Sequence, residues 1–486
     1  MERDKMEKTR ENVSCNEKKQ AMNPYLPLDE YVPDGEPRIF GDRLWIYGSH
    51  DEAGGEGYCV NDYVVWSAPL SDLGNWRYEG ISYAYEQTGE TLEEAGNLAA
   101  PDCVQGRDGR FYLYYNRGAK NACEVAVSDR PQGPFEYLGN VAFPDGMEPA
   151  EKLFDPGVLI DDDGRIYLYT GFVPTPGSPW INVAGKYSLA FELEPDMRTI
   201  RKGPVELLPG CLAAKGTEFE NHGFYEASSP RKINGKYYMI YSSEQSHDLC
   251  YAISDQPMEG FRYGGVLVSN ADIGYHGNME LKTPYGNTHG GLVKIGSQWY
   301  IFYHRQTHGI ECCRQGCAEP ITLNPDGSFN QAEMTSCGLN GGPLRGMGTY
   351  SAAYACNLTF DGVGRLSVRR CVRDQQPHIF EEKTADGSRI HYIANMQKGT
   401  RAGFKYFRLG EAKKIRITVQ AEKAGLMGVY LDEECTKKAA GISFDGSEHG
   451  EWIKAEGVFS APEGVFPLFF RLESDGVICW REFTLE

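Results

Sequence analysis

A short strand-forming phrase that occurs five times constrains this chain more than any other feature. Each copy begins with a charged or amide residue, continues with aromatic and aliphatic residues, and follows a glycine-containing turn. The copies are residues 43–47, 110–114, 165–169, 236–240 and 298–302. Asn-Gly and Asp-Gly between strand formers are typical of the two-residue turn of a β-hairpin. The sequence therefore predicts five hairpins, each with one copy as a strand.

The spacing of the copies indicates a repeat architecture. They begin at residues 43, 110, 165, 236 and 298, so successive copies are 67, 55, 71 and 62 residues apart. A unit of this size with several short strands is typical of a β-propeller blade. One twisted sheet cannot bury both of its faces alone, whereas blades stacked around an axis can. We therefore expect an all-β fold with a five-bladed β-propeller.

An ionisable residue stands eight to ten residues before every copy. These residues are Asp34, Asp102, Asp155, Glu226 and His289. The innermost strands of a propeller line its central channel, so equivalent positions converge at one end of that channel. Any single acid could cap a turn or lie in solvent, but gathering like charges is costly. Five ionisable residues in phase therefore indicate a functional site.

Four stretches around these residues carry a resemblance to a known family. They are residues 31–37 (YVPDGEP), 154–157 (FDPG), 225–229 (YEASS) and 287–291 (NTHGG). The chain from about Asn23 to about Gly342 resembles glycoside hydrolase family 43, the five-bladed propeller hydrolases that include α-L-arabinofuranosidases, β-xylosidases and arabinanases. The order, the spacing and the phase of the stretches all agree with that family.

The resemblance implies three catalytic carboxyl groups. Asp34 would be the general base, Glu226 the general acid, and Asp155 the residue that adjusts the pKa of the acid and orients the sugar. Glu36, two residues after Asp34, remains an alternative base. The family inverts the anomeric configuration, which implies a wide carboxyl separation of roughly 6.5–9.5 Å with room for a water molecule. The aromatic residues before Glu226 would partly desolvate it and raise its pKa.

The same resemblance implies residues that bind substrate. Asp102 would shape the sugar pocket and Arg314 would contact the innermost sugar. Trp180, on a Pro/Gly-rich loop, could stack on a sugar or pack beneath the loop. No cofactor is required, but a structural calcium or sodium ion in the central channel is compatible with the family. His289 would hold that ion, through water because calcium prefers oxygen ligands, or would be a neutral hydrogen-bond partner of the acids.

Residues 343–486 have a different pattern. Glycine is dense from 338 to 348, and short runs with period-two alternation follow at 415–419, 428–431 and 466–472. We expect a linker and a β-sandwich of jelly-roll type, which resembles the carbohydrate-binding modules often appended to this family. The propeller would then occupy residues 23–342.

Residues 1–22 are polar and charged and predict a flexible tail. They contain no apolar core of a secretory signal, which favours a cytoplasmic protein, and no run long enough to span a membrane occurs. The 14 cysteines are scattered and are expected to be reduced thiols. The clustered Cys312, Cys313 and Cys317 could bind zinc, but they lack a second pair at suitable spacing and more plausibly pack in a loop.

The net charge of the chain limits the kinds of partner that it can bind. With 49 basic and 68 acidic residues, the chain carries a net charge of −19, which argues against nucleic acid and anionic membranes. An oligosaccharide substrate is expected, with terminal α-L-arabinofuranosyl or β-D-xylosyl residues removed by exo-action. A non-catalytic carbohydrate-binding propeller and a β-D-galactofuranosidase remain alternatives. The sequence indicates no oligomeric state.

Overall fold

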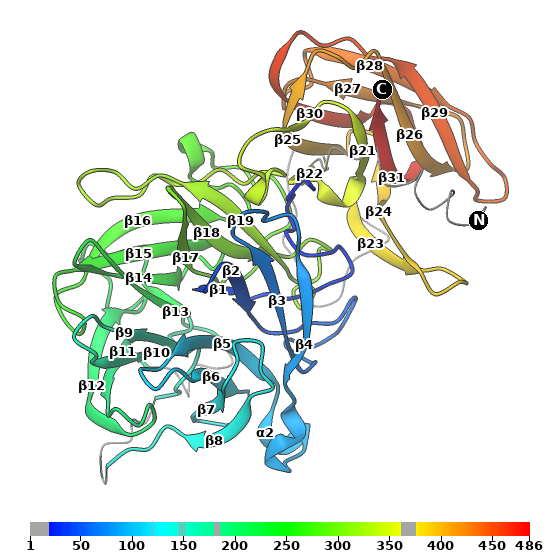
Figure 1. The fold of residues 1–486 in the computed structure, drawn as a ribbon. Helices are drawn as coiled ribbons and strands as arrows, with labels where there is room; N and C mark the ends of the chain where they lie inside the picture. The colour runs from blue at the N-terminus through cyan, green and yellow to red at the C-terminus, as the bar shows by residue number, and fades with distance from the viewer. Residues whose placement is uncertain are drawn as a thin grey trace, which may run out of the picture.

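Five antiparallel sheets follow one another along the chain around a common axis, and two further sheets pack against each other beside them (Figure 1). The computed structural model describes residues 19–118, 120–144, 146, 149, 151–178, 185–360 and 376–486. Within these ranges, none of the helices has the length and apolar character needed to cross a membrane. The all-β fold with a propeller and a C-terminal sandwich is thus confirmed.

Each of the five sheets is a blade of the propeller. Blade 1 contains β1 (Glu36–Phe40), β2 (Arg43–Tyr47), β3 (Tyr63–Pro69) and β4 (Arg77–Tyr83), and blade 2 contains β5 (Leu98–Gln105), β6 (Phe111–Arg117), β7 (Cys123–Ser128) and β8 (Glu136–Asn140). Blade 3 contains β9 (Gly157–Ile160), β10 (Ile166–Thr170), β11 (Tyr187–Leu193) and β12 (Ile200–Pro209). Blade 4 contains β13 (Phe224–Ile233), β14 (Lys236–Ser243), β15 (Asp248–Ser254) and β16 (Arg262–Ser269), and blade 5 contains β17 (Leu292–Ile295), β18 (Gln298–Arg305) and β19 (Gln315–Ile321). Short helices lie in the loops: η1 (Tyr85–Thr88), α2 (Leu92–Ala95), η3 (Tyr275–Gly277), η4 (Gly338–Asn340) and η5 (Ala352–Tyr354).

The repeated phrase forms the second strand of every blade, as the turn chemistry predicts. In blade 4, Ile233 pairs with Lys236 across Asn234 and Gly235, whose φ angles are 51° and 81°. Both turn residues are left-handed, which suits a two-residue turn between twisted strands. The first strands of the blades contact one another around the ring, β1 with β5 and β17, and β9 with β5 and β13. They therefore line the central channel.

The aromatic residues of the phrase build the cores between blades. Trp45 and Tyr47 of blade 1 pack with Phe111 and Tyr115 of blade 2 in one buried cluster. An equivalent cluster joins blade 5 to blade 1 and includes Phe302. Because each blade buries its faces only against its neighbours, these clusters are what hold the ring closed.

The segment before blade 1 packs over the junction between blade 5 and blade 1. The amide of Asn23 donates to Ser336 O at 3.1 Å, and the amide of Tyr25 donates to Gly316 O at 3.1 Å. Ala21 is 5% exposed, and Gln20 Nε2 donates to Tyr350 Oη at 3.0 Å. The expected flexible tail therefore extends too far: residues 20–22 are packed against the protein, and residues 1–18 lie outside the described ranges.

The second part of the chain forms a β-sandwich, drawn in yellow to red in Figure 1. One sheet contains β20 (Leu344–Arg345), β25 (Arg401–Leu409), β30 (Gly464–Leu472), β27 (Gly425–Tyr430) and β28 (Lys438–Phe444), with β22 (Asn357–Thr359) paired to β25. The other contains β23 (His378–Lys383), β24 (Arg389–Gln397), β31 (Val477–Leu485), β26 (Lys414–Ala421) and β29 (Trp452–Val458), with β21 (Gly348–Ser351) paired to β31. A core that includes the fully buried Trp480 fills the space between them.

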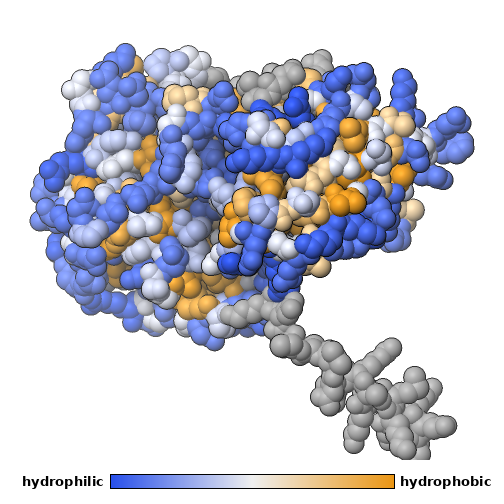
Figure 2. All heavy atoms as spheres, turned by 90° about the horizontal axis from the view of Figure 1, so that it is seen from above, coloured by the Kyte–Doolittle hydropathy of each residue, from blue (hydrophilic) through white to orange (hydrophobic). Residues whose placement is uncertain are grey.

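Buried polar contacts fix the sandwich to the propeller. Lys405 Nζ lies 3.0 Å from Asp272 Oδ2, and Arg305 Nη2 donates to Cys356 O at 3.0 Å. Nearer the channel, Tyr31 Oη donates to Glu381 Oε2 on β23 at 2.9 Å. Hydrophilic side chains cover much of the face shown in Figure 2, in line with the high content of charged residues, and apolar side chains lie among them.

Candidate active site

Four of the blades share an unusual backbone feature at or within two residues of the positions that the sequence singled out. Asp34, Ala100, Asp155 and Ala227 have φ angles of 57°, 36°, 47° and 70°, one in each of the first four blades. Residues with a side chain rarely adopt this left-handed conformation, and such strain gathers at functional sites. In each of these four blades the left-handed residue lies just before or within the first strand.

Asp34 is buried and surrounded by donors. Ser49 Oγ donates to its Oδ2 at 2.6 Å, and Arg314 Nη1 donates to its Oδ1 at 3.0 Å. Its own amide donates to His304 Nδ1 at 3.2 Å. Burial alone would raise the pKa of Asp34, but the charge of Arg314 and the His304 contact outweigh it and hold that pKa well below its usual range. Asp34 is therefore a carboxylate at any ordinary pH.

Arg314 links Asp34 to a second carboxylate. Its Nε and Nη2 donate to the two oxygens of Asp51 at 2.8 and 2.9 Å, and its guanidinium carbon lies 4.8 Å from the centre of the Tyr58 ring. The side chain is 2% exposed. A guanidinium fork held this way is rigid, so Arg314 fixes the position of Asp34.

Glu226 has the opposite electrostatic setting. It is half-buried at the start of β13. Burial and the negative charge of Asp34 raise its pKa to about 7, although Arg314, a hydrogen bond from Asn287 and Lys152 act in the other direction. Near neutral pH this carboxyl group therefore carries a proton in a large fraction of the molecules, while Asp34 does not.

Asp155 interacts electrostatically with both of these groups. Its Oδ2 accepts a hydrogen bond from the amide of Ala227 at 3.1 Å and lies 3.5 Å from His289 Nδ1. Burial, followed by the charges of Glu226 and Asp34, raises its pKa well above the usual value. Asp155 and Glu226 are thus a coupled pair in which one negative charge disfavours a second.

His289 is buried beside Asp155, and burial lowers its pKa, so it is neutral. One imidazole and one carboxylate supply few of the six to eight oxygen ligands that calcium takes. These residues fit an ion only if water completes its coordination, and the central ion stays a prediction. We call Asp34, Asp155, Glu226, His289 and Arg314 the Asp34 cluster.

Asp102 belongs to a different group. Arg38 donates to it from Nε at 2.9 Å and from Nη2 at 2.6 Å, and the Val158 amide donates at 2.7 Å. Asp102 is fully buried, and its oxygens are occupied by protein donors. The structure therefore does not bring Asp102 to the other phased residues, in contrast to its expected place in the sugar pocket.

Arg231 and Glu36 complete this second group, with Nη2 and Oε2 2.6 Å apart. We call Glu36, Arg38, Asp102 and Arg231 the Arg38 cluster. A Cβ at Gly291, just before β17, would lie 2.6 Å from Arg231 Nη2 and 2.8 Å from Glu36 Oε2, so a larger residue there would displace this ion pair. Because Glu36 is paired here, it is a poorer candidate for a base than Asp34.

Sequence reasoning missed the arginines of this group and the Ser49 and His304 contacts of Asp34. Glu36 and Arg38 lie two residues apart on β1 and so on one face of it, and that alternation could have signalled Arg38. Ser49 lies in the loop after β2 and His304 on β18, and neither carries such a signal. Trp180 lies outside the described residues.

A cavity of about 580 Å³ lies beside the Asp34 cluster, between blade 1 and the β23–β24 hairpin. Its lining includes Tyr31, Asp51, Tyr78, Glu381 and Arg389. Asp51 is shared with the Asp34 cluster through Arg314. The lining of the cavity thus meets the Asp34 cluster through Asp51 and Arg314, and residues of the sandwich form part of its wall.

One carboxyl group that stays ionised and a second whose pKa is raised to about 7 match the two groups that general acid–base hydrolysis of glycosides needs. Comparison with known proteins agrees. The family described as Glycosyl hydrolases family 43 matches residues 38–329. The chain belongs to this family and is a glycosidase.

Individual relatives extend the likeness over the whole chain. A xylosidase/arabinosidase of Thermoclostridium stercorarium is 40% identical, over 96% of this chain and 99% of its own. The crystal structure of an arabinoxylan arabinofuranohydrolase from Bacillus subtilis matches 96% of this chain and 99% of its own at TM-score 0.50 and 22% identity, a likeness of fold alone. A β-xylosidase/α-arabinofuranosidase from a compost metagenome, solved with xylotriose in a calcium-free form, matches 65% of this chain and 98% of its own at TM-score 0.51 and 26% identity.

Proposed function

We propose that the protein is an inverting exo-glycosidase that removes terminal α-L-arabinofuranosyl or β-D-xylosyl residues from oligosaccharides. The observation that carries the proposal is the contrast between the surroundings of two carboxyl groups in one cluster, since Asp34 is bound by Ser49 and Arg314 and Glu226 is not. Arg314 and His304 hold the pKa of Asp34 well below its usual range, whereas burial and the charge of Asp34 raise the pKa of Glu226 to about 7. Two such groups can serve as base and acid at the same pH.

In the proposed reaction, Glu226 gives its proton to the glycosidic oxygen as the bond from that oxygen to the anomeric carbon breaks. Asp34 takes a proton from a water molecule, whose oxygen forms the new bond to the anomeric carbon from the opposite face. The sugar leaves with inverted configuration and the aglycone leaves as an alcohol. Asp155 tunes the acid as the other half of a coupled pair of carboxyl groups, because a negative charge on either one disfavours a charge on the other.

The choice of sugar is supported by the names of relatives. The Thermoclostridium stercorarium protein is named for both activities, as is the metagenomic structure. Within this proposal the two activities belong to the same Asp34 cluster.

A panel of aryl glycosides tests the proposal. We expect hydrolysis of aryl α-L-arabinofuranoside or aryl β-D-xyloside, and the first anomer seen by NMR should be the inverted one. Asp34→Asn should lower kcat by about 10²–10⁴, the usual contribution of a positioned base. Retention of configuration would refute the role of Asp34. Sugar binding without any turnover would favour a non-catalytic propeller, and turnover of aryl β-D-galactofuranoside alone would change the sugar.

A further inference from the structure

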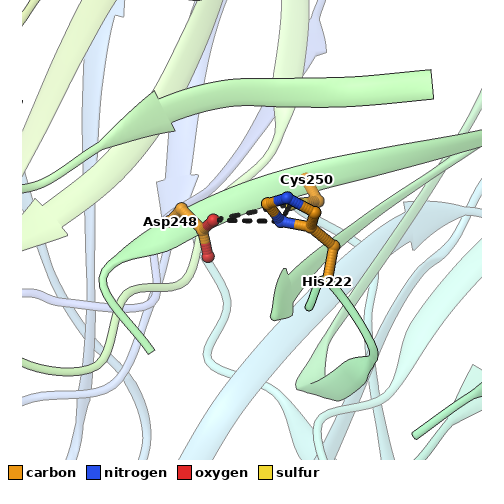
Figure 3. A group of neighbouring side chains, drawn as sticks. All are labelled: His222, Asp248 and Cys250. Carbon is orange, nitrogen blue, oxygen red and sulfur yellow. Dashed lines mark hydrogen bonds and ion pairs between the residues drawn. The ribbon is translucent and has the colours of Figure 1, made fainter. Parts of the chain in front are cut away.

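Three side chains of blade 4 converge on one point outside the channel clusters (Figure 3). His222 lies in the loop before β13, and Asp248 and Cys250 lie on β15, two residues apart and so on one face of that strand. In the described part of the chain, no other group of three His, Cys, Asp or Glu residues has ligand atoms close enough to hold one metal ion.

The three ligand atoms form a nearly equilateral triangle. His222 Nδ1 lies 3.6 Å from Asp248 Oδ2 and 3.7 Å from Cys250 Sγ, and Cys250 Sγ lies 3.7 Å from Asp248 Oδ2. Around tetrahedral zinc, bonds of about 2.0–2.3 Å place a nitrogen and an oxygen about 3.3 Å apart, and either of them about 3.5 Å from a sulfur. The observed triangle is larger by only a few tenths of an ångström on each side.

The same geometry excludes a proton relay. In a Cys-His-Asp triad the nucleophile and the acid contact opposite nitrogens of the imidazole. Here both Cys250 and Asp248 approach Nδ1. Three unlike donors directed at one point are the arrangement of a chelate.

Neighbouring groups hold each donor in place. Ser243 Oγ donates to Asp248 Oδ1 at 2.5 Å, which leaves Oδ2 directed at the other two atoms. The His222 ring stacks on Tyr263, with centroids 4.9 Å apart and planes inclined by 14°. The carbonyl of His222 accepts from Tyr241 Oη at 2.8 Å. Such outer contacts orient metal ligands in known sites.

The donors also indicate the metal and its route. Imidazole, carboxylate and thiolate together suit zinc, whereas calcium and magnesium prefer oxygen alone. The side chain of His222 is 30% exposed and that of Asp248 is 3% exposed, so an ion reaches the site from the His222 side. Water can take the fourth position there.

We propose that His222, Asp248 and Cys250 bind one zinc ion, which ties the loop before β13 to β15. On binding, the Cys250 thiol loses its proton to solvent and the thiolate becomes a ligand. Because the site forms only in the folded chain, the ion stabilises the native state. The proposal does not depend on which sugar is hydrolysed.

Metal titration of the full chain tests it. Protein treated with chelator and desalted should bind one equivalent of Zn²⁺, and its Tm should rise with the Zn²⁺ concentration. Co²⁺ should bind in its place and give the intense visible bands of tetrahedral coordination with a thiolate charge-transfer band. Absence of stoichiometric binding, or a Co²⁺ spectrum without the thiolate band, would overturn the proposal.

Variants separate the site from adventitious binding. Cys250→Ser and His222→Gln should each lose the thermal response to Zn²⁺. His222 is partly exposed, so its variant tests the site even if the buried Cys250→Ser fails to fold. Cys123→Ala is the matched control, since Cys123 is a buried cysteine on β7 of blade 2, and it should bind as the wild type does. Loss of binding in Cys123→Ala, or full binding in His222→Gln, would contradict the assignment.

Discussion

Two clusters of buried charges lie on the inner strands of the propeller, and they differ in the ratio of arginines to carboxyl groups. The Arg38 cluster pairs two arginines with two carboxylates at 2.6 Å each. The Asp34 cluster has three carboxyl groups and one arginine, and that arginine is shared with Asp51. The first is a closed set of ion pairs, whereas the second carries surplus negative charge, so its pKa values move apart. The comparison indicates that the catalytic carboxyl groups are those of the cluster in which acids outnumber arginines.

Glu226→Gln removes the proposed general acid of the Asp34 cluster and should have the largest effect on kcat. We expect kcat on a natural oligosaccharide to fall by about 10²–10⁴ because the leaving oxygen is no longer protonated. An aryl glycoside with a good leaving group needs little protonation and should lose far less. Steady-state kinetics on both substrates measure this difference. Equal small losses would show that Glu226 is not the acid.

Arg38→Met breaks the balanced cluster and should act on stability. It leaves Asp102 buried without its partner, which costs about 3–5 kcal/mol in free energy of unfolding. Urea denaturation measures the change, and kcat per folded molecule should stay near the wild-type value. Arg110→Met is the control, because the exposed Arg110–Asp108 pair should contribute only about 0–1 kcal/mol.

A double variant sharpens this prediction. In Arg38→Met with Asp102→Leu, both charges are gone, so much of the lost stability should return. If Arg38→Met alone left stability unchanged, the Arg38 cluster would not be the structural element inferred here.

The pH profile should show the smallest effect, about tenfold per pH unit. Glu226 acts in its protonated form, so kcat/KM should fall as the pH rises above the pKa of about 7. Asp34 acts in its ionised form, and its depressed pKa keeps the acid side of the profile flat. Profiles of wild type and Glu226→Gln on the activated aryl glycoside test this, since the variant should lack the alkaline limb. An unchanged limb would assign it to another group.

Local chemistry explains why much of the propeller was predictable. The turn at Asn234 and Gly235 and the aromatic strands beside it are specified within a few residues, so the hairpins and their number follow from pattern. The phase of Asp34, Asp155, Glu226 and His289 predicted their convergence, because equivalent positions of a repeat share one place in the ring.

Asp102 shows that the position of a residue relative to the repeated phrase does not always predict which cluster it joins. Asp34 and Asp155 are themselves the left-handed residues, and Glu226 directly precedes one, whereas Asp102 follows Ala100 by two positions. Two residues of strand move a side chain by about 7 Å. That shift carries Asp102 to Arg38 and away from the Asp34 cluster, and the sequence alignment could not resolve it.

The sequence by itself determined the class of fold, the number of blades and the residues that face the channel, because these follow from periodicity and turn chemistry. Only the tertiary structure decided which arginine pairs with which acid. Arg314 and Asp34 are 280 positions apart in the sequence, and Arg231 and Glu36 are 195 positions apart. The residues of each pair meet only when the ring of blades closes. Since a pKa depends on the charges within a few ångströms, the division of labour among identical carboxyl groups is a property of that closure.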